Sequence, residues 1–135
     1  MTHVIRPVPL TAAFAVLGVA ILLAVAGHAA WWVIPAGVIG PDLSFLAALG
    51  APQPEHGLMP ARAVVPYNIV HHPAGPIAAV VVSLLVGNST ALALSFAWGS
   101  HLLWDRGVGY NLRNADGSIK NGGGRAHSEF VEEPR

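Results

Sequence analysis

The sequence predicts an all-α membrane protein, a four-helix transmembrane bundle, from three observations. The 135-residue chain is 53% hydrophobic and 10% charged, with a mean hydropathy of +0.55, which is too apolar for an ordinary soluble domain. Between Pro7 and Trp104, the only Asp, Glu, Lys or Arg residues are Asp42, Glu55 and Arg62. The apolar stretches also come close to the roughly 20 residues that a helix needs to cross a bilayer.

Composition also excludes several classes of function. The chain has no cysteine, so it has no disulfide, no thiolate metal site and no cysteine nucleophile, and any chemistry must use His, carboxylate and amide groups. The formal net charge is +0 and no basic stripe is present, which argues against a nucleic-acid partner. The expected partners are membrane lipids and, beyond them, a larger membrane complex or a second copy of the chain.

The first predicted helix covers residues 10–30 and follows a short polar leader that contains Arg6. The same run also fits the core of a signal peptide, because Ala24-Val25-Ala26 and Gly27-His28-Ala29 offer small residues at which a peptidase cuts. The length of the run, and the apolar chain that follows it directly, favour a helix that stays in the membrane.

The second predicted helix, residues 31–49, begins at Trp31-Trp32, which is typical of an aromatic belt at a membrane interface. Pro35 and Gly40-Pro41-Asp42 interrupt it, so the helix is kinked, or it restarts with Asp42 as an N-cap. Non-helical backbone at membrane depth is tolerated only where protein or a wet cavity covers it. The interruption therefore indicates an interior surface.

The third predicted helix, residues 62–86, follows a loop rich in proline and glycine. Pro73 and Pro76 have no amide proton, so we expect a kink at which the carbonyls of Ile69 and His72 lose their helical partners. The first turns of this helix carry four polar or aromatic side chains, those of Tyr67, Asn68, His71 and His72.

The fourth predicted helix, residues 89–105, begins with Ser89 as a candidate N-cap. Its last turns carry His101 and Asp105, which lie on one face because they are four residues apart, followed by Arg106. Residues 111–135 are rich in Gly, Asn and charge and have no apolar period, so we expect a soluble, flexible tail.

The positive charges predict the orientation of the chain in the membrane. They lie on the leader, on the loop between the second and third helices and on the tail, namely Arg6, Arg62, Arg106, Arg113, Lys120 and Arg125. The positive-inside rule then places both termini in the cytoplasm. In this arrangement Asp42, Asn68, His71, His101 and Asp105 can all meet in the cytoplasmic leaflet.

These side chains suggest a metal site, since ionisable groups inside membrane spans are functional candidates by default. His71, His101 and Asp105 are the candidate metal ligands, and Asp42 and Asn68 are the candidate catalytic residues. Mixed imidazole and carboxylate ligands suit zinc, manganese or iron. Tyr67, His72, Arg106 and Tyr110 are candidate supporting residues. The same groups can instead be structural, with His101 bonded to Asp105, Arg106 neutralising a carboxylate and Asn68 bridging two helices.

Three stretches together resemble one family, number 4260 in the domain-of-unknown-function series. They are Pro41-Asp42-Leu43-Ser44, Tyr67-Asn68-Ile69-Val70-His71, and the segment from His101 to Tyr110, HLLWDRGVGY. The resemblance covers residues 11–112 and implies a small integral protein of the bacterial inner membrane without an assigned activity.

A weaker resemblance links the chain to the membrane-bound metal-dependent hydrolases. Pro41-Asp42 and the spacing of His101 and Asp105 match the first and last motifs of that family. Ser44 replaces the second Asp of the first motif, no Arg follows His71 or His72, and the Thr-His-Ser motif is missing. These differences imply fewer metal ligands or a lost activity.

Three functions remain open at this point. The first is a metal-dependent hydrolase of a lipid-like substrate, and the second is a non-enzymatic accessory or scaffold subunit. In the second case Gly18, Gly37, Gly40 and Gly75 would let helices approach closely. The third, passage of protons or ions, is disfavoured because four short helices without an internal repeat offer little room for alternating access.

Overall fold

The computed structural model describes residues 5–52, 54 and 57–120. Within these residues the chain is all-α, as predicted. The described residues contain no strand, only an isolated β-bridge between Arg113 and Ile119. The elements are α1 (Pro7–Val25), α2 (Val33–Ile39), the 3₁₀ helix η1 (Gly40–Ala48), α3 (Ala61–Val70), α4 (Ala74–Leu85) and α5 (Ser89–Val108). They form four rods, because η1 continues α2 and α4 follows α3.

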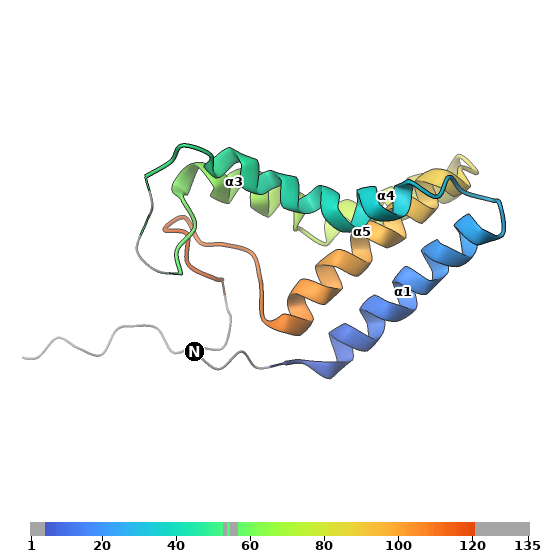
Figure 1. Cartoon of the computed structure of the whole chain (residues 1–135), viewed down its shortest axis with the longest axis horizontal. Coiled ribbons are helices and arrows are strands. Elements are labelled where there is room, and N and C mark those ends of the chain that lie inside the picture. The colour runs from blue at the N-terminus through green and yellow to red at the C-terminus, as the bar shows by residue number, and fades with distance from the viewer. Residues whose placement is uncertain (1–4, 53, 55–56, 121–135) are drawn as a thin grey trace, which may run out of the picture.

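Helix α5 is the centre of the fold (Figure 1). It packs against α1, α2 and α4, whereas α3 packs against η1. The Arg6 amide donates to the Gly107 carbonyl at one end of the α1–α5 pair, and the Ala30 amide donates to the Thr90 hydroxyl near the other end. Helices α1 and α5 therefore run in opposite directions, and Figure 1 shows that the chain also reverses between consecutive rods. The end of η1 packs against the start of α3, and the segment after α5 bonds to the same region.

Local signals set both ends of α5. The Asn88 side chain accepts a hydrogen bond from the Ala91 amide, so Asn88 is the N-cap and the prediction of Ser89 is wrong by one residue. Gly109 has a φ of 94°, a left-handed conformation that suits glycine, and it ends the helix after Val108. The helix thus extends three residues beyond the predicted end at residue 105.

Asp42 does not cap a helix. It lies inside η1, whose first residue is Gly40, and no side-chain cap bond is present at the start of this element. The N-cap alternative for Asp42 is therefore wrong, and its carboxylate is free to point toward the neighbouring rods.

The third rod is interrupted at His71-His72-Pro73, between α3 and α4. Two carbonyls at this point bond to side chains of α5. The Val70 carbonyl accepts from the Trp98 indole, and the His71 carbonyl accepts from the Arg106 guanidinium. His72, which was expected to have a free carbonyl, instead accepts from the Gly75 amide. Side chains of α5 thus satisfy the carbonyls of Val70 and His71, and a local backbone amide satisfies that of His72.

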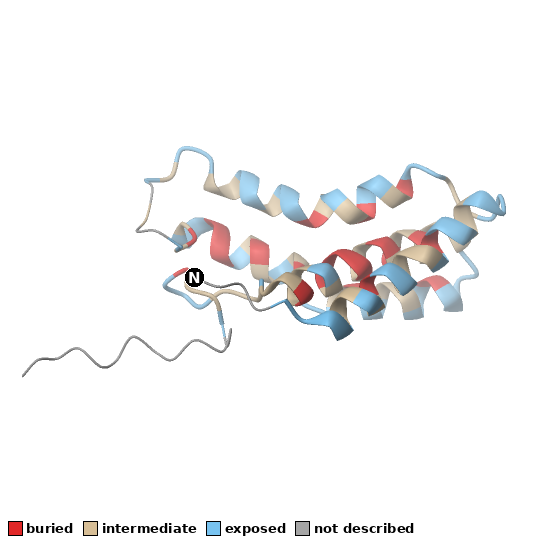
Figure 2. Ribbon diagram, turned by 60° about the horizontal axis from the view of Figure 1, so that its bottom comes forward, coloured by how far each residue is buried: buried red, intermediate tan, exposed pale blue. Residues whose placement is uncertain are grey.

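The surface of the fold is strongly apolar. Buried residues gather on the faces that the helices turn toward one another, and exposed residues line the outward faces (Figure 2). Large exposed side chains include Phe14, Leu22, Ile77 and Leu85. Two stretches, Pro7–Val25 and Ala61–Leu85, are long and apolar enough to cross a membrane, and Val33–Ala48 is a shorter apolar helix.

Residues 111–120, which were expected to begin a flexible tail, fold back onto α3. The Gly117 carbonyl accepts from the Met59 amide, and the Asn68 side chain binds the backbone of Arg113. Hydrogen bonds from the Ser118 hydroxyl and amide stabilise the turn and hold the pKa of Asp116 below its ordinary value. The rest of the predicted tail, residues 121–135, lies outside the described residues.

Candidate metal centre

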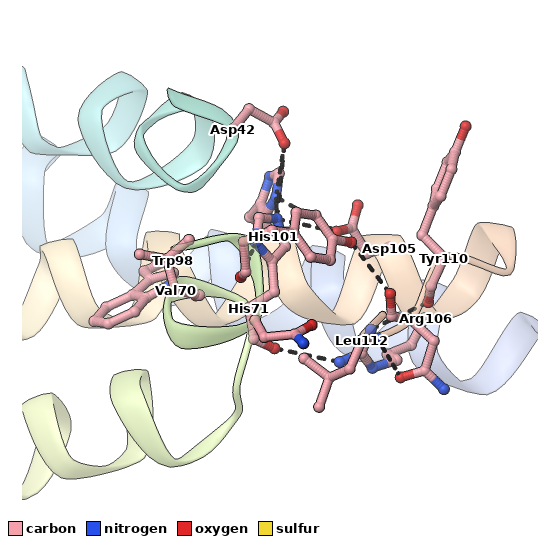
Figure 3. A network of polar contacts seen from close by, with 12 residues as sticks. Asp42, Val70, His71, Trp98, His101, Asp105, Arg106, Tyr110 and Leu112 are labelled. Carbon is pink, nitrogen blue, oxygen red and sulfur yellow. Dashed lines mark hydrogen bonds and ion pairs between the residues drawn. The ribbon is translucent and has the colours of Figure 1, made fainter. Parts of the chain in front are cut away.

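Four ionisable side chains meet where η1, the interruption after α3, and α5 come together (Figure 3). The Nε2 atoms of His71 and His101 are 3.2 Å apart. The Asp42 carboxylate lies 3.7 Å from His71 Nε2 and 3.5 Å from His101 Nε2. The Asp105 carboxylate lies 3.5 Å from both nitrogens. We call these four residues the His/Asp cluster.

The spacing of these atoms matches the coordination shell of a metal ion. Zinc bonds of roughly 2.0 to 2.1 Å in a tetrahedron separate neighbouring ligand atoms by about 3.3 Å. The five distances within the His/Asp cluster run from 3.2 to 3.7 Å. Asp42, His71 and His101 each offer one ligand atom, and these three atoms lie within 4.8 Å of one another. Asp42, His71 and His101 could therefore hold one ion, whereas Asp105, 3.5 Å from both histidine nitrogens, is not part of this group of three.

His71 is held in the orientation that a ligand requires. Its side chain is 0% exposed, its Nδ1 lies 3.0 Å from the Tyr67 carbonyl, and its ring stacks on the Tyr67 ring at 3.9 Å. A carbonyl only accepts hydrogen bonds, so Nδ1 carries the proton and Nε2 presents a lone pair to the cluster. This is the usual arrangement of a histidine that binds a metal through Nε2.

The other members of the cluster differ in exposure. The side chains of His101 and Asp105 are 8% and 13% exposed, because α5 turns this face toward the neighbouring rods. The Asp42 side chain is 51% exposed. The cluster is thus closed on three sides and accessible at Asp42.

A cavity of about 370 Å³ adjoins the accessible side. This volume lies within the roughly 300 to 1,000 Å³ that small-molecule sites occupy. Asp42, His101 and Asp105 contribute to one wall, and the other walls are mostly apolar side chains of α1, α2 and α5, including Phe14, Leu17, Val38, Ile39 and Trp104. The cavity therefore joins an apolar lining to the polar groups of the cluster.

Asn68 lies outside this cluster. Its amide nitrogen donates to the Arg113 carbonyl at 2.8 Å, and its oxygen accepts from the Arg113 amide at 2.7 Å. Both ends of the side chain are therefore used in holding residues 111–120 on α3, and the structure places this predicted catalytic residue in a structural contact.

Three of the predicted supporting residues contact members of the cluster, and the fourth, His72, bonds to Ala74 instead. Tyr67 stacks on His71 and donates through its hydroxyl to the Asn111 carbonyl, and Arg106 donates to the carbonyls of His71 and Tyr110. The exposed His72 ring accepts from the Ala74 amide. Tyr110 is 44% exposed, and its amide donates to the Asp105 carbonyl.

Trp98 is a supporting residue that the sequence analysis missed. Its indole Nε1 donates to the Val70 carbonyl at 2.8 Å, directly before His71. Its ring lies against Gly75, where an added Cβ would be 2.6 Å from it. Trp98, His101 and Asp105 are spaced i, i+3 and i+7, so their shared helical face was the signal that could have revealed this role.

Comparison with known proteins identifies one family. The family model described as a domain of unknown function (DUF4260) matches residues 10–121, a range that contains the whole His/Asp cluster and residues 111–120. Neither the curated proteins nor the solved structures contain a match to this chain.

Proposed function

Because this chain belongs to the DUF4260 family, whose description assigns no activity, we propose a function from the site itself: a membrane-embedded, metal-dependent hydrolase of a lipid-like substrate. The observation that carries the proposal is the His/Asp cluster, in which His71 is buried and its Nε2 lone pair faces three further ligand groups. Imidazole and carboxylate ligands suit zinc, manganese or iron.

Hydrolysis is proposed because the accessible side of the cluster would let water and substrate reach a bound ion. A bound divalent ion would make a coordinated water acidic enough to supply hydroxide near neutral pH. His71, His101 and Asp105 would hold the ion. Asp42, with half of its side chain exposed beside the cavity, would complete the shell or take the proton from water. The apolar walls of the cavity would hold the chain of the substrate and keep its ester or phosphate bond at the cluster.

The membrane setting is part of the same proposal. The two long apolar stretches and the outward-facing Phe14, Leu22, Ile77 and Leu85 support insertion into a bilayer. We place the chain in the bacterial inner membrane as a multi-pass protein, with both termini cytoplasmic, because the cations lie at the leader, the second loop and residues 106–125. The His/Asp cluster would then face the cytoplasmic leaflet.

Elemental analysis of the detergent-purified protein tests the metal centre. We expect near-stoichiometric zinc, manganese or iron in the wild type and none in Asp105→Asn or His101→Ala. His72→Ala is the matched control, because this exposed histidine adjoins His71 in the sequence and its ring accepts from the Ala74 amide. A wild type that stays metal-free after dialysis against zinc and manganese would contradict the metal centre.

Turnover on a panel of lipid phosphates and esters tests the reaction. The metal-loaded wild type is expected to release product, and Asp105→Asn is expected to lose this activity while its helical circular dichroism is unchanged. Equal turnover by the two proteins on a substrate would rule out the assigned role of Asp105. The accessory-subunit alternative draws on the same exposed apolar surface, and it predicts a metal-free protein that copurifies stoichiometrically with a partner.

A further inference from the structure

A second cavity lies on the opposite face of α5 from the His/Asp cluster. It has a volume of about 250 Å³ and runs between α1, α4 and α5. At 100° per residue, the α5 residues that line it are centred about 140° around the helix from His101 and Asp105. Its walls are almost wholly apolar and include Val16, Pro76, Ile77, Val80, Phe96 and Leu103. We call this cavity the α1/α4/α5 groove.

One cation, Arg106, lines this groove. Its guanidinium donates to the carbonyls of Tyr110 and His71, at 3.1 and 3.2 Å. No carboxylate forms an ion pair with it among the residues that the structure describes. A guanidinium has five N–H donors, so Arg106 retains both its charge and free donors at the edge of an apolar groove.

The groove has the length of one lipid leaflet. Its α5 lining extends from Ser95 to Arg106, a rise of about 16 Å at 1.5 Å per residue. One leaflet contributes half of the roughly 30 Å hydrocarbon core of a bilayer. Because α4 runs antiparallel to α5, Pro73 lies toward the Arg106 end and Val80 toward the Ser95 end. Arg106 thus lies at one end of the α1/α4/α5 groove, which is about as long as one leaflet is thick.

We propose that the α1/α4/α5 groove binds an anionic phospholipid of the surrounding bilayer. One acyl chain lies along the groove, and the headgroup phosphate accepts hydrogen bonds from Arg106. This inference rests on the membrane setting proposed above and is independent of the metal and of hydrolysis. Arg106 would then bind the lipid phosphate in addition to donating a hydrogen bond to the carbonyl of His71.

Native mass spectrometry of the detergent-purified full chain tests this site. The probes are phosphatidylglycerol and the uncharged diacylglycerol with identical acyl chains, because only the first carries a phosphate. A charge-assisted contact predicts that the wild type retains phosphatidylglycerol roughly tenfold better. Arg106→Gln is expected to bind both lipids equally. Arg62→Gln is the matched control, because Arg62 is an exposed cation at the start of α3 and does not line the groove.

A second variant tests the groove without changing its charge. A Cβ at Gly99 would lie 3.8 Å from Pro76, so the side chain of Gly99→Leu would fill the groove, and we expect it to bind both lipids weakly. If Arg106→Gln does not fold, Gly99→Leu alone tests whether lipid binds in the groove.

Two results would overturn the lipid site: equal retention of both lipids by the wild type, or unchanged phosphatidylglycerol binding in Gly99→Leu. Metal analysis of the same samples separates the two proposals. A metal-free protein that prefers phosphatidylglycerol contradicts only the metal centre, and a metal-loaded protein without preference contradicts only the lipid site.

Discussion

The side chain of Asn68 shows how one amide can replace a backbone partner. It offers a donor and an acceptor to the carbonyl and amide of Arg113, as a neighbouring strand would. Next to it, the Tyr67 hydroxyl donates to the Asn111 carbonyl at 3.3 Å. Together with the bond between Met59 and Gly117, these contacts hold residues 111–120 on α3 without a strand or a hydrophobic core of their own.

We predict that Asn68→Asp releases residues 111–120. The carboxylate has no proton to donate and would face the Arg113 carbonyl, and a buried unmade bond costs about 1 to 3 kcal/mol. Hydrogen exchange of residues 111–120 should therefore accelerate, whereas the metal content should stay at the wild-type value. Asn88→Asp is the control, since Asp is as good an N-cap as Asn. Loss of the metal with unchanged exchange would place Asn68 in the cluster instead.

At the level of the helices, close packing of α2 on α5 positions Asp42. An added Cβ at Gly37 would lie 2.6 Å from the Ala97 Cβ and 2.9 Å from the Leu94 carbonyl oxygen. The two helices therefore meet almost backbone to backbone at Gly37. Because η1 continues α2, the distance between Asp42 and the histidines depends on this crossing.

We predict that Gly37→Ala moves α2 away from α5 and weakens the metal centre. Overpacking of this kind costs about 1 to 3 kcal/mol, so thermal unfolding in detergent should occur at a lower temperature and metal affinity should fall. Gly40→Ala is the matched control on the same rod, because nothing lies within 4 Å of a Cβ at Gly40. Identical melting and metal content in the two variants would refute the role of this crossing.

At the level of the whole molecule, the antiparallel rods make a testable prediction about topology. The chain contains no cysteine, so single cysteines report the side of the membrane without background. In intact cells, a membrane-impermeant maleimide should label His28→Cys and Val86→Cys, at one end of the rods. Pro52→Cys and Lys120→Cys, at the other end, should be labelled only after lysis. All four positions are exposed, so equal labelling in intact cells would contradict the spanning arrangement.

Local features of the sequence were sufficient to predict much of the fold and the pairing of His101 with Asp105. Apolar runs and turn residues predicted an all-α chain, and the family resemblance proved correct over residues 10–121. His101 and Asp105 could be paired from their spacing alone, because four residues make one helical turn. Of the five residues predicted to meet, Asp42, His71, His101 and Asp105 lie together in the structure, whereas Asn68 bonds to Arg113 outside the cluster.

The features that the sequence did not predict depend on contacts between residues far apart in the chain. Asn68 and Arg113 are 45 residues apart, and Trp98 and Val70 are 28 residues apart, so no local pattern encodes either pair. Residues 111–120 have the composition of a solvated segment, yet hydrogen bonds to Asn68 and Met59 order them on α3. A side-chain amide or indole takes its role from whichever backbone group the packed helices bring to it, and only the three-dimensional arrangement of the rods specifies that partner.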